Sequence, residues 1–273
     1  MQAVERALRR DRLLTLLALA VLTVLAWIWL AQGAGMDMAP RATLDPFPHR
    51  AGGAMAEMPG MADMPGMTAA PEPWTPSRLA LAFSMWWVMM VAMMLPAAAP
   101  VILLHARSAQ QASGGAPTGP FVGGYLAIWA LFSLIATAAH VLLDQAGVLA
   151  PMTMGSVARW FSATVLIAAG LYQASPLKGA CLAHCRNPAQ FLSRHYRPGR
   201  GGAFRMGVRH GAFCVGCCWL LMALLFVGGV MNLAWIAALT LLVAAEKLLP
   251  GGRYVAYAAG VGFIAWGALT LAA

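Results

Sequence analysis

Charged residues are scarce in this chain. Asp, Glu, Lys and Arg together make up only 10 % of it and nine residues are acidic, whereas hydrophobic residues make up 61 %. The mean hydropathy of +0.71 is far above that of a soluble globular domain. The sequence also has no phosphate-binding loop, no Ser/His/Asp arrangement and no pair of carboxylates at a usable spacing. These absences argue against a soluble domain, an ATP-driven pump and a hydrolase.

Apolar runs of about 20 residues, the length that crosses a bilayer, recur along the chain. They predict an all-α polytopic membrane protein with about seven transmembrane helices (six to seven), at 13–31, 79–104, 121–143, 157–175, 207–229, 231–249 and 253–272. The chain then divides into three parts. These are a basic amino terminus with the first helix (1–31), a Met/Pro/Gly-rich and largely disordered loop (32–78), and a helical membrane domain (79–273) containing a cysteine-bearing cytoplasmic loop (176–206).

The basic residues predict the orientation of the chain. The net charge is +9, but the basic residues lie in short segments between apolar runs, where they set topology and do not form a nucleic-acid surface. They cluster before the first run and between the fourth and fifth runs, which places both segments in the cytoplasm. The loop 32–78 and the carboxyl terminus are then outside, and a bacterial inner membrane is the simplest location. The first run could instead be a cleaved signal, although about 19 apolar residues are long for that role.

The segment 55–67 has a methionine at every third position. A period of three fits neither an amphipathic helix nor a strand, whereas Pro59 and Pro65 favour a polyproline-like course with three residues per turn. Thioethers along one edge of such a segment would select Cu(I) or Ag(I) over Mg, Ca or Zn. The alternative is a flexible low-complexity linker. We name this set the Met ladder: Met55, Met58, Met61, Met64 and Met67.

Methionine also recurs on the second predicted helix. Met85, Met89 and Met93 fall on one face at i, i+4 and i+8, with Met90 and Met94 beside them. A stripe of thioethers could thus run down the membrane. Ordinary core packing is the alternative, because methionine fills irregular gaps well.

All five cysteines lie between residues 181 and 218. Cys214, Cys217 and Cys218 are spaced i, i+3 and i+4, so a helix places their Cβ atoms about 5–6 Å apart on one face. Modest rotamer changes would let these sulfurs share one metal at bonds of about 2.3 Å. Cys181 and Cys185, with His184 between them, could fold back from the adjoining segment to complete the ligand shell. Since the cytoplasm keeps thiols reduced, the cluster indicates metal binding or redox activity and not structural disulfides.

These motifs together resemble a bacterial family of predicted metal-binding integral membrane proteins, sometimes labelled copper chaperones. The resemblance covers roughly residues 80–250. It rests on the segments 85–96, 175–178, 181–185 and 207–222, on Met231-Asn232 and on Glu246-Lys247. It implies metal binding by the cysteine segments, which here means Cys181, Cys185, Cys214, Cys217 and Cys218. The Met ladder is not among the motifs that carry the resemblance.

Three functions remain open from the sequence. In the leading interpretation the Met ladder captures Cu(I) outside and the cysteine cluster holds it at the inner face, where zinc is the second candidate metal. The second is a membrane thiol–disulfide oxidoreductase that uses Cys214 and Cys217, although helix embedding and the adjacent Cys218 argue against free exchange. The third is an accessory subunit that delivers metal to a partner metalloenzyme or copper-carrier protein. We expect metal handling in the lipid bilayer and do not predict enzymatic activity.

Overall fold

The structure, a computed structural model, describes residues 2–35, 73–111, 117–150 and 154–272, and the Met ladder lies outside these ranges. Within them the fold is built of helices, with a single antiparallel bridge between Leu149 and Ser156. The helices are α1 (Gln2–Ala31), α2 (Pro76–Gln111), α3 (Thr118–Gln145), α4 (Arg159–Gln173), α5 (Pro176–Arg186), α6 (Pro188–His195), α7 (Gly199–Ala223), α8 (Leu225–Gly228), α9 (Leu233–Leu248) and α10 (Gly252–Ala272).

The prediction of an all-α membrane protein is confirmed, with five or six candidate spans in the described residues against the six to seven expected. Five helices in the described residues are long and apolar enough to cross a bilayer, or six if α4 and α5 form one span bent by 64°. The run 157–175 is interrupted after Gln173, and the run 231–249 yields an α9 of only 16 residues. Such a helix is about 24 Å long, which is shorter than the hydrocarbon core of about 30 Å.

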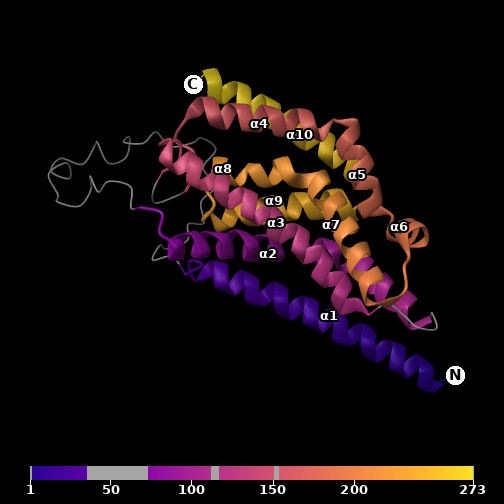
Figure 1. The fold of residues 1–273 in the computed structure, drawn as a ribbon. Coiled ribbons are helices and arrows are strands. Elements are labelled where there is room, and N and C mark those ends of the chain that lie inside the picture. Colours follow the sequence, from indigo (N-terminus) through magenta and orange to yellow (C-terminus); the bar gives the residue numbers. More distant parts are fainter. Residues whose placement is uncertain (1, 36–72, 112–116, 151–153, 273) are drawn as a thin grey trace.

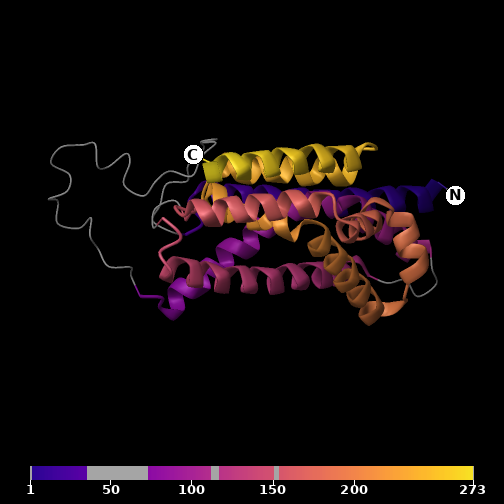
Figure 2. The same ribbon diagram turned by 90° about the horizontal axis from the view of Figure 1, so that it is seen from above.

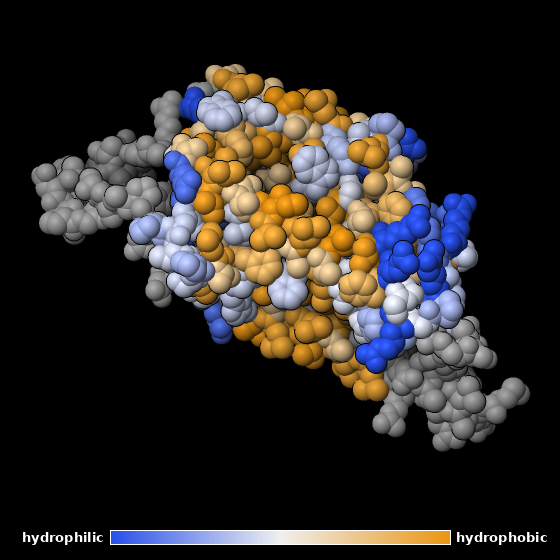
Figure 3. Space-filling model, in the orientation of Figure 1, coloured by the Kyte–Doolittle hydropathy of each residue, from blue (hydrophilic) through white to orange (hydrophobic). Residues whose placement is uncertain are grey.

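Helices run lengthwise through the molecule, with the amino and carboxyl termini at opposite ends (Figures 1 and 2). α1 lies along α2 on one side and α10 along α4 on the other, while α3 packs on α7 between them. The space-filling view shows a broad apolar middle, and strongly hydrophilic residues gather at the end that holds α6 and the start of α7 (Figure 3). Exposed apolar side chains such as Leu13, Leu241 and Val261 are 60–70 % accessible, as lipid-facing residues are.

The segment 176–206 was expected to be a loop but is mostly helical. Ser175 caps α5 by accepting a hydrogen bond from the Lys178 N–H at 3.1 Å, and Pro176 occupies the first helical position. Pro188 starts α6 in the same way. Proline suits this position because its missing N–H would have no helical partner there. Leu182, Phe191 and Leu192 are then buried, which anchors both short helices on the bundle.

Glycines allow α3 and α7 to approach backbone to backbone. A Cβ atom at Gly207 of α7 would collide with the carbonyl oxygen of Phe121, and one at Gly124 of α3 would collide with that of Phe204. Small residues at helix interfaces are the usual means of close packing in membranes, where no hydrophobic force drives helices together. This contact fixes the position of α7, the helix that carries three of the cysteines.

We expect Gly207→Ala to destabilise the protein by about 1–3 kcal/mol, the usual cost of overpacking, since the colliding atom is backbone and cannot swing away. Gly201→Ala in the same helix is the matched control, because nothing lies within 4 Å of its added Cβ. The free energy of unfolding in detergent micelles, measured by denaturant titration, checks this. Equal stability of the two variants would contradict the assigned packing.

Candidate metal centre

Three cysteines share one buried turn of α7. Cys214, Cys217 and Cys218 are 2 %, 1 % and 1 % exposed, as their i, i+3 and i+4 spacing on a core-facing stripe requires. The thiols of Cys217 and Cys218 each donate to the carbonyl oxygen of Cys214, at 3.0 Å. Their sulfurs are therefore gathered around one point of the helix backbone.

A fourth thiol comes from α5. The Cys185 thiol lies within side-chain hydrogen-bonding reach of the thiols of Cys214 and Cys217. Cys185, Cys214, Cys217 and Cys218 are named the thiol cluster below. All of its members are free thiols, as is Cys181. The expectation that the segment after the fourth helix folds back towards the helical cysteines describes this arrangement.

Gly216 lets α5 lie close against α7. A Cβ atom at this position would be 2.9 Å from the Cys181 sulfur, so Cys181 occupies space that any larger residue would fill. The Tyr172 hydroxyl donates to the Gly216 carbonyl and ties the end of α4 to the same turn. Cys181 thus lies on the outer edge of the turn, half-buried beside the thiol cluster.

His184 has different contacts from those of the cysteines. Its ring stacks on Phe213 with centroids 4.0 Å apart and planes 8° apart, and its Nδ1 is 2.9 Å from the carbonyl oxygen of Ala180. These contacts hold α5 on α7 through an aromatic face. The structure brings together four of the five predicted cysteines and sets His184 against Phe213.

Lys247 and Met94 contact the cluster, although neither was among the predicted metal ligands: the sequence placed Met94 only beside the methionine stripe. The ammonium of Lys247 on α9 donates to the Cys214 sulfur at 3.0 Å and to the Met94 sulfur at 3.8 Å. The Cys218 sulfur is 3.9 Å from the same thioether. The Glu246-Lys247 pair at the end of an apolar run was a signal for Lys247, but a lysine near a helix end more often extends to the membrane surface.

The methionine stripe of α2 is buried in full. Met85, Met89 and Met93 are at most 1 % exposed, as are Met90 and Met94. Among them the structure shows contact with the thiol cluster for Met94, which lies one turn beyond Met90 on the helix. Tyr125 of α3 reinforces the contact, because its hydroxyl donates to the Met94 carbonyl at 3.1 Å and lies 3.2 Å from the Cys214 sulfur.

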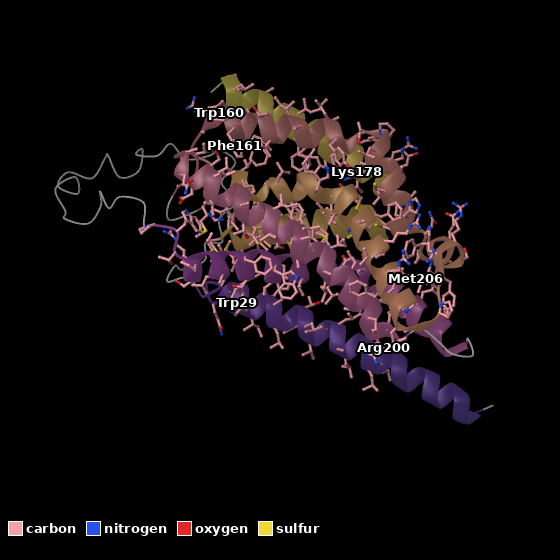
Figure 4. All side chains as sticks on the ribbon, in the orientation of Figure 1. Trp29, Trp160, Phe161, Lys178, Arg200 and Met206 are labelled. Carbon is pink, nitrogen blue, oxygen red and sulfur yellow. The ribbon has the colours of Figure 1, made fainter. Side chains whose placement is uncertain are left out.

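A buried polar network stands beside the thiol cluster. Lys178 of α5 pairs with Glu246 of α9 at 2.6 Å, and Gln173 at the end of α4 donates to the other carboxylate oxygen at 2.6 Å. Lys178 also donates to the Gln173 amide oxygen, and both ionised side chains are 2 % exposed. Lys178 points into the bundle from the end near α5 (Figure 4). Since adjacent helical residues diverge by about 100°, Glu246 faces this network while Lys247 faces the sulfurs.

The donor set suits a soft metal ion. Thiols and a thioether converge, and these are the ligands that favour Cu(I) and also accept zinc. In the described ranges no three or more His, Cys, Asp or Glu side chains already stand in a metal-holding arrangement. The reason is visible at Cys217 and Cys218, whose thiols are turned towards a backbone carbonyl, so binding requires rotation about their Cα–Cβ bonds.

We expect Lys178→Met to destabilise the protein by about 3–5 kcal/mol, because it leaves the Glu246 carboxylate buried and unpaired. The double variant Lys178→Met/Glu246→Met removes both charges and should recover most of the loss. Denaturant titration in micelles of the wild type and the two variants checks this. A double variant no more stable than the single one would contradict the pairing.

Comparison with known proteins identifies the family of this chain. No curated protein and no solved structure gives a match. The family model described as "PpoB2: Copper chaperone" matches residues 83–270, which include α2 from its third turn, the thiol cluster, Lys247 and most of α10. The match extends over most of the chain and confirms the resemblance seen in the sequence. This multi-pass membrane protein belongs to the PpoB2 copper-chaperone family.

Proposed function

We propose that this protein binds Cu(I) at the thiol cluster and passes it to a partner metalloprotein. The observation that carries the proposal is the convergence of four thiols from α5 and α7 with the Met94 thioether from α2 inside a membrane bundle. Membership of a copper-chaperone family supports copper as the metal. Each thiol that binds the metal loses its proton. The negative charge of the site therefore forms together with the thiolate–metal bonds.

Copper is favoured over zinc by the kind of donor. A structural zinc site uses four thiolate or imidazole ligands in a closed tetrahedron, whereas thioethers favour Cu(I). Met94 is aimed at the cluster, and His184 is stacked on Phe213. The Cys181 thiol, on the edge of the cluster beside Gly216, lies where the ion would enter or leave and is not needed to hold it.

In this proposal copper moves along a gradient of affinity. The Met ladder, proposed to lie outside a bacterial inner membrane, captures the ion by weak, fast-exchanging thioethers, and the thiolates hold it more tightly. The buried methionines of α2 are the intermediate donors. Met90 and Met94 are one turn apart on the helix and lead to the cluster, so they are preferred over Met85, Met89 and Met93 for this role.

Burial of the cysteines supports copper handling over thiol–disulfide exchange. An oxidoreductase must present its attacking thiol to a partner, whereas Cys214 and Cys217 are 2 % and 1 % exposed. A small ion can reach such thiols where a partner's cysteine cannot. Delivery requires a partner with stronger copper ligands, which is why a metalloenzyme or a copper-carrier protein is the proposed acceptor.

We expect the variant Cys214→Ser/Cys217→Ser/Cys218→Ser to lose Cu(I) binding, since a serine hydroxyl is a hard donor of similar size. Elemental analysis of anaerobically loaded, purified protein measures copper per chain. The control Cys181→Ser should retain copper, because Cys181 lies at the edge of the cluster. A wild type that binds no copper would refute the proposal.

We expect Met94→Leu to weaken Cu(I) binding and the matched variant Met89→Leu/Met93→Leu to leave it unchanged. Leucine keeps the volume and removes the soft donor, and among these three methionines the sulfur contact to the cluster belongs to Met94. Competition with a colorimetric Cu(I) chelator measures both. Weakening in the double variant alone would instead place the copper path on the Met85/Met89/Met93 face.

A further inference from the structure

The ammonium of Lys247 is buried among sulfurs. The residue is 6 % exposed, and its Nζ is 3.0 Å from the Cys214 sulfur and 3.8 Å from the Met94 sulfur. In the part of the chain that the structure describes, the carboxylate of the neighbouring Glu246 pairs with Lys178, and no carboxylate lies within ion-pair distance of Lys247. This lysine therefore points its charge at the place where a metal would bind.

A buried charge is costly unless it is balanced. The groups around Lys247 that can supply negative charge are the thiols, and they do so when they give up protons to bind a metal. Two thiolates, one ammonium and one monovalent cation sum to zero charge. A divalent cation in the same place meets twice the repulsion from the ammonium and needs a third thiolate before the charges sum to zero.

We propose that Lys247 is the specificity-determining residue of the thiol cluster and that its fixed charge selects monovalent soft cations over divalent ones. The inference rests on the proposed function, because it assigns to the same site the class of ion that it accepts. Lys247 is not a ligand here. It stays beside the bound ion and donates to the Cys214 sulfur, as partners of metal ligands commonly do.

The surrounding contacts argue that Lys247 does more than hold α9 in place. The Lys178–Glu246–Gln173 network already ties α9 to α4 and α5, so α9 does not need a second buried cation for anchorage. An apolar residue at position 247 would also spare the protein the cost of burying a charge. A positive charge that is buried at this cost next to four thiols therefore acts on the ion that those thiols bind.

Ag(I) and Cd(II) are suitable probes, because both are soft closed-shell ions that favour thiolates and neither changes oxidation state, so they differ chiefly by one unit of charge. We expect Lys247→Gln to lower the ratio of Ag(I) to Cd(II) affinity by about tenfold or more, since it removes a unit charge within a few ångströms of the ion. Lys247→Arg keeps the charge and should keep the ratio within about threefold of the wild type. Competition titrations of the full-length protein in micelles give both affinities.

The outcomes separate the two proposals. If Lys247→Gln binds Ag(I) with an unchanged Ag(I)/Cd(II) ratio, the role of Lys247 is overturned and the copper site stands. If the wild type binds neither Ag(I) nor Cu(I), the proposed function itself fails. If Lys247→Gln does not fold, Lys247→Met takes its place, because it removes the charge and keeps an unbranched side chain: a lower Ag(I)/Cd(II) ratio supports the proposal, and an unchanged ratio overturns it.

Discussion

The ion pair between Lys178 and Glu246 holds together the end of the bundle on which the thiol cluster depends. It joins α5 to α9 at 2.6 Å, and Gln173 extends it to α4. In an apolar interior these polar groups can find hydrogen-bond partners only in one another. The three helices are therefore restricted to the arrangement in which every one of these groups has a partner. That arrangement places Cys185 of α5 against α7 and turns the next residue of α9, Lys247, towards the sulfurs.

Close backbone contacts supply the second constraint. Gly124 and Gly207 seat α7 on α3, and Gly216 makes room for Cys181 of α5. Two helices, α3 and α5, therefore lie against α7 without large side chains at these contacts. Because α7 is fixed on both sides, its cysteines are held in register with Met94 and Tyr125. The thiol cluster is thus a product of helix packing, which brings the sulfurs near one another.

Local spacing made part of the site predictable. The i, i+3 and i+4 pattern places Cys214, Cys217 and Cys218 on one helical face whatever surrounds it. The helix that begins at Pro176 was not predicted, although Ser175-Pro176 is a helix-start signal. Which face of another helix meets this one is not a local property. Met94 and Met93 are adjacent in sequence and equally buried, and only the packing of α2 shows that Met94 reaches the sulfurs. Lys247 escaped prediction for the same reason, since burial against α7 overrides the usual extension of lysine to the surface.

The shortness of α9 bears on the energy barrier that an ion meets. Its 16 residues span about 24 Å, and Lys247 lies one residue from its end, whereas α2 and α10 beside it are 36 and 21 residues long. Hydrophobic mismatch of this kind is relieved by thinning or by polar groups drawn into the apolar layer. In the proposed copper binding, a short α9 would lower the dehydration barrier at the end where the thiols lie, because that barrier depends on how much apolar material separates the ion from water. The thiol cluster can thus be inaccessible to the cysteines of a partner protein and still lie close to the aqueous phase.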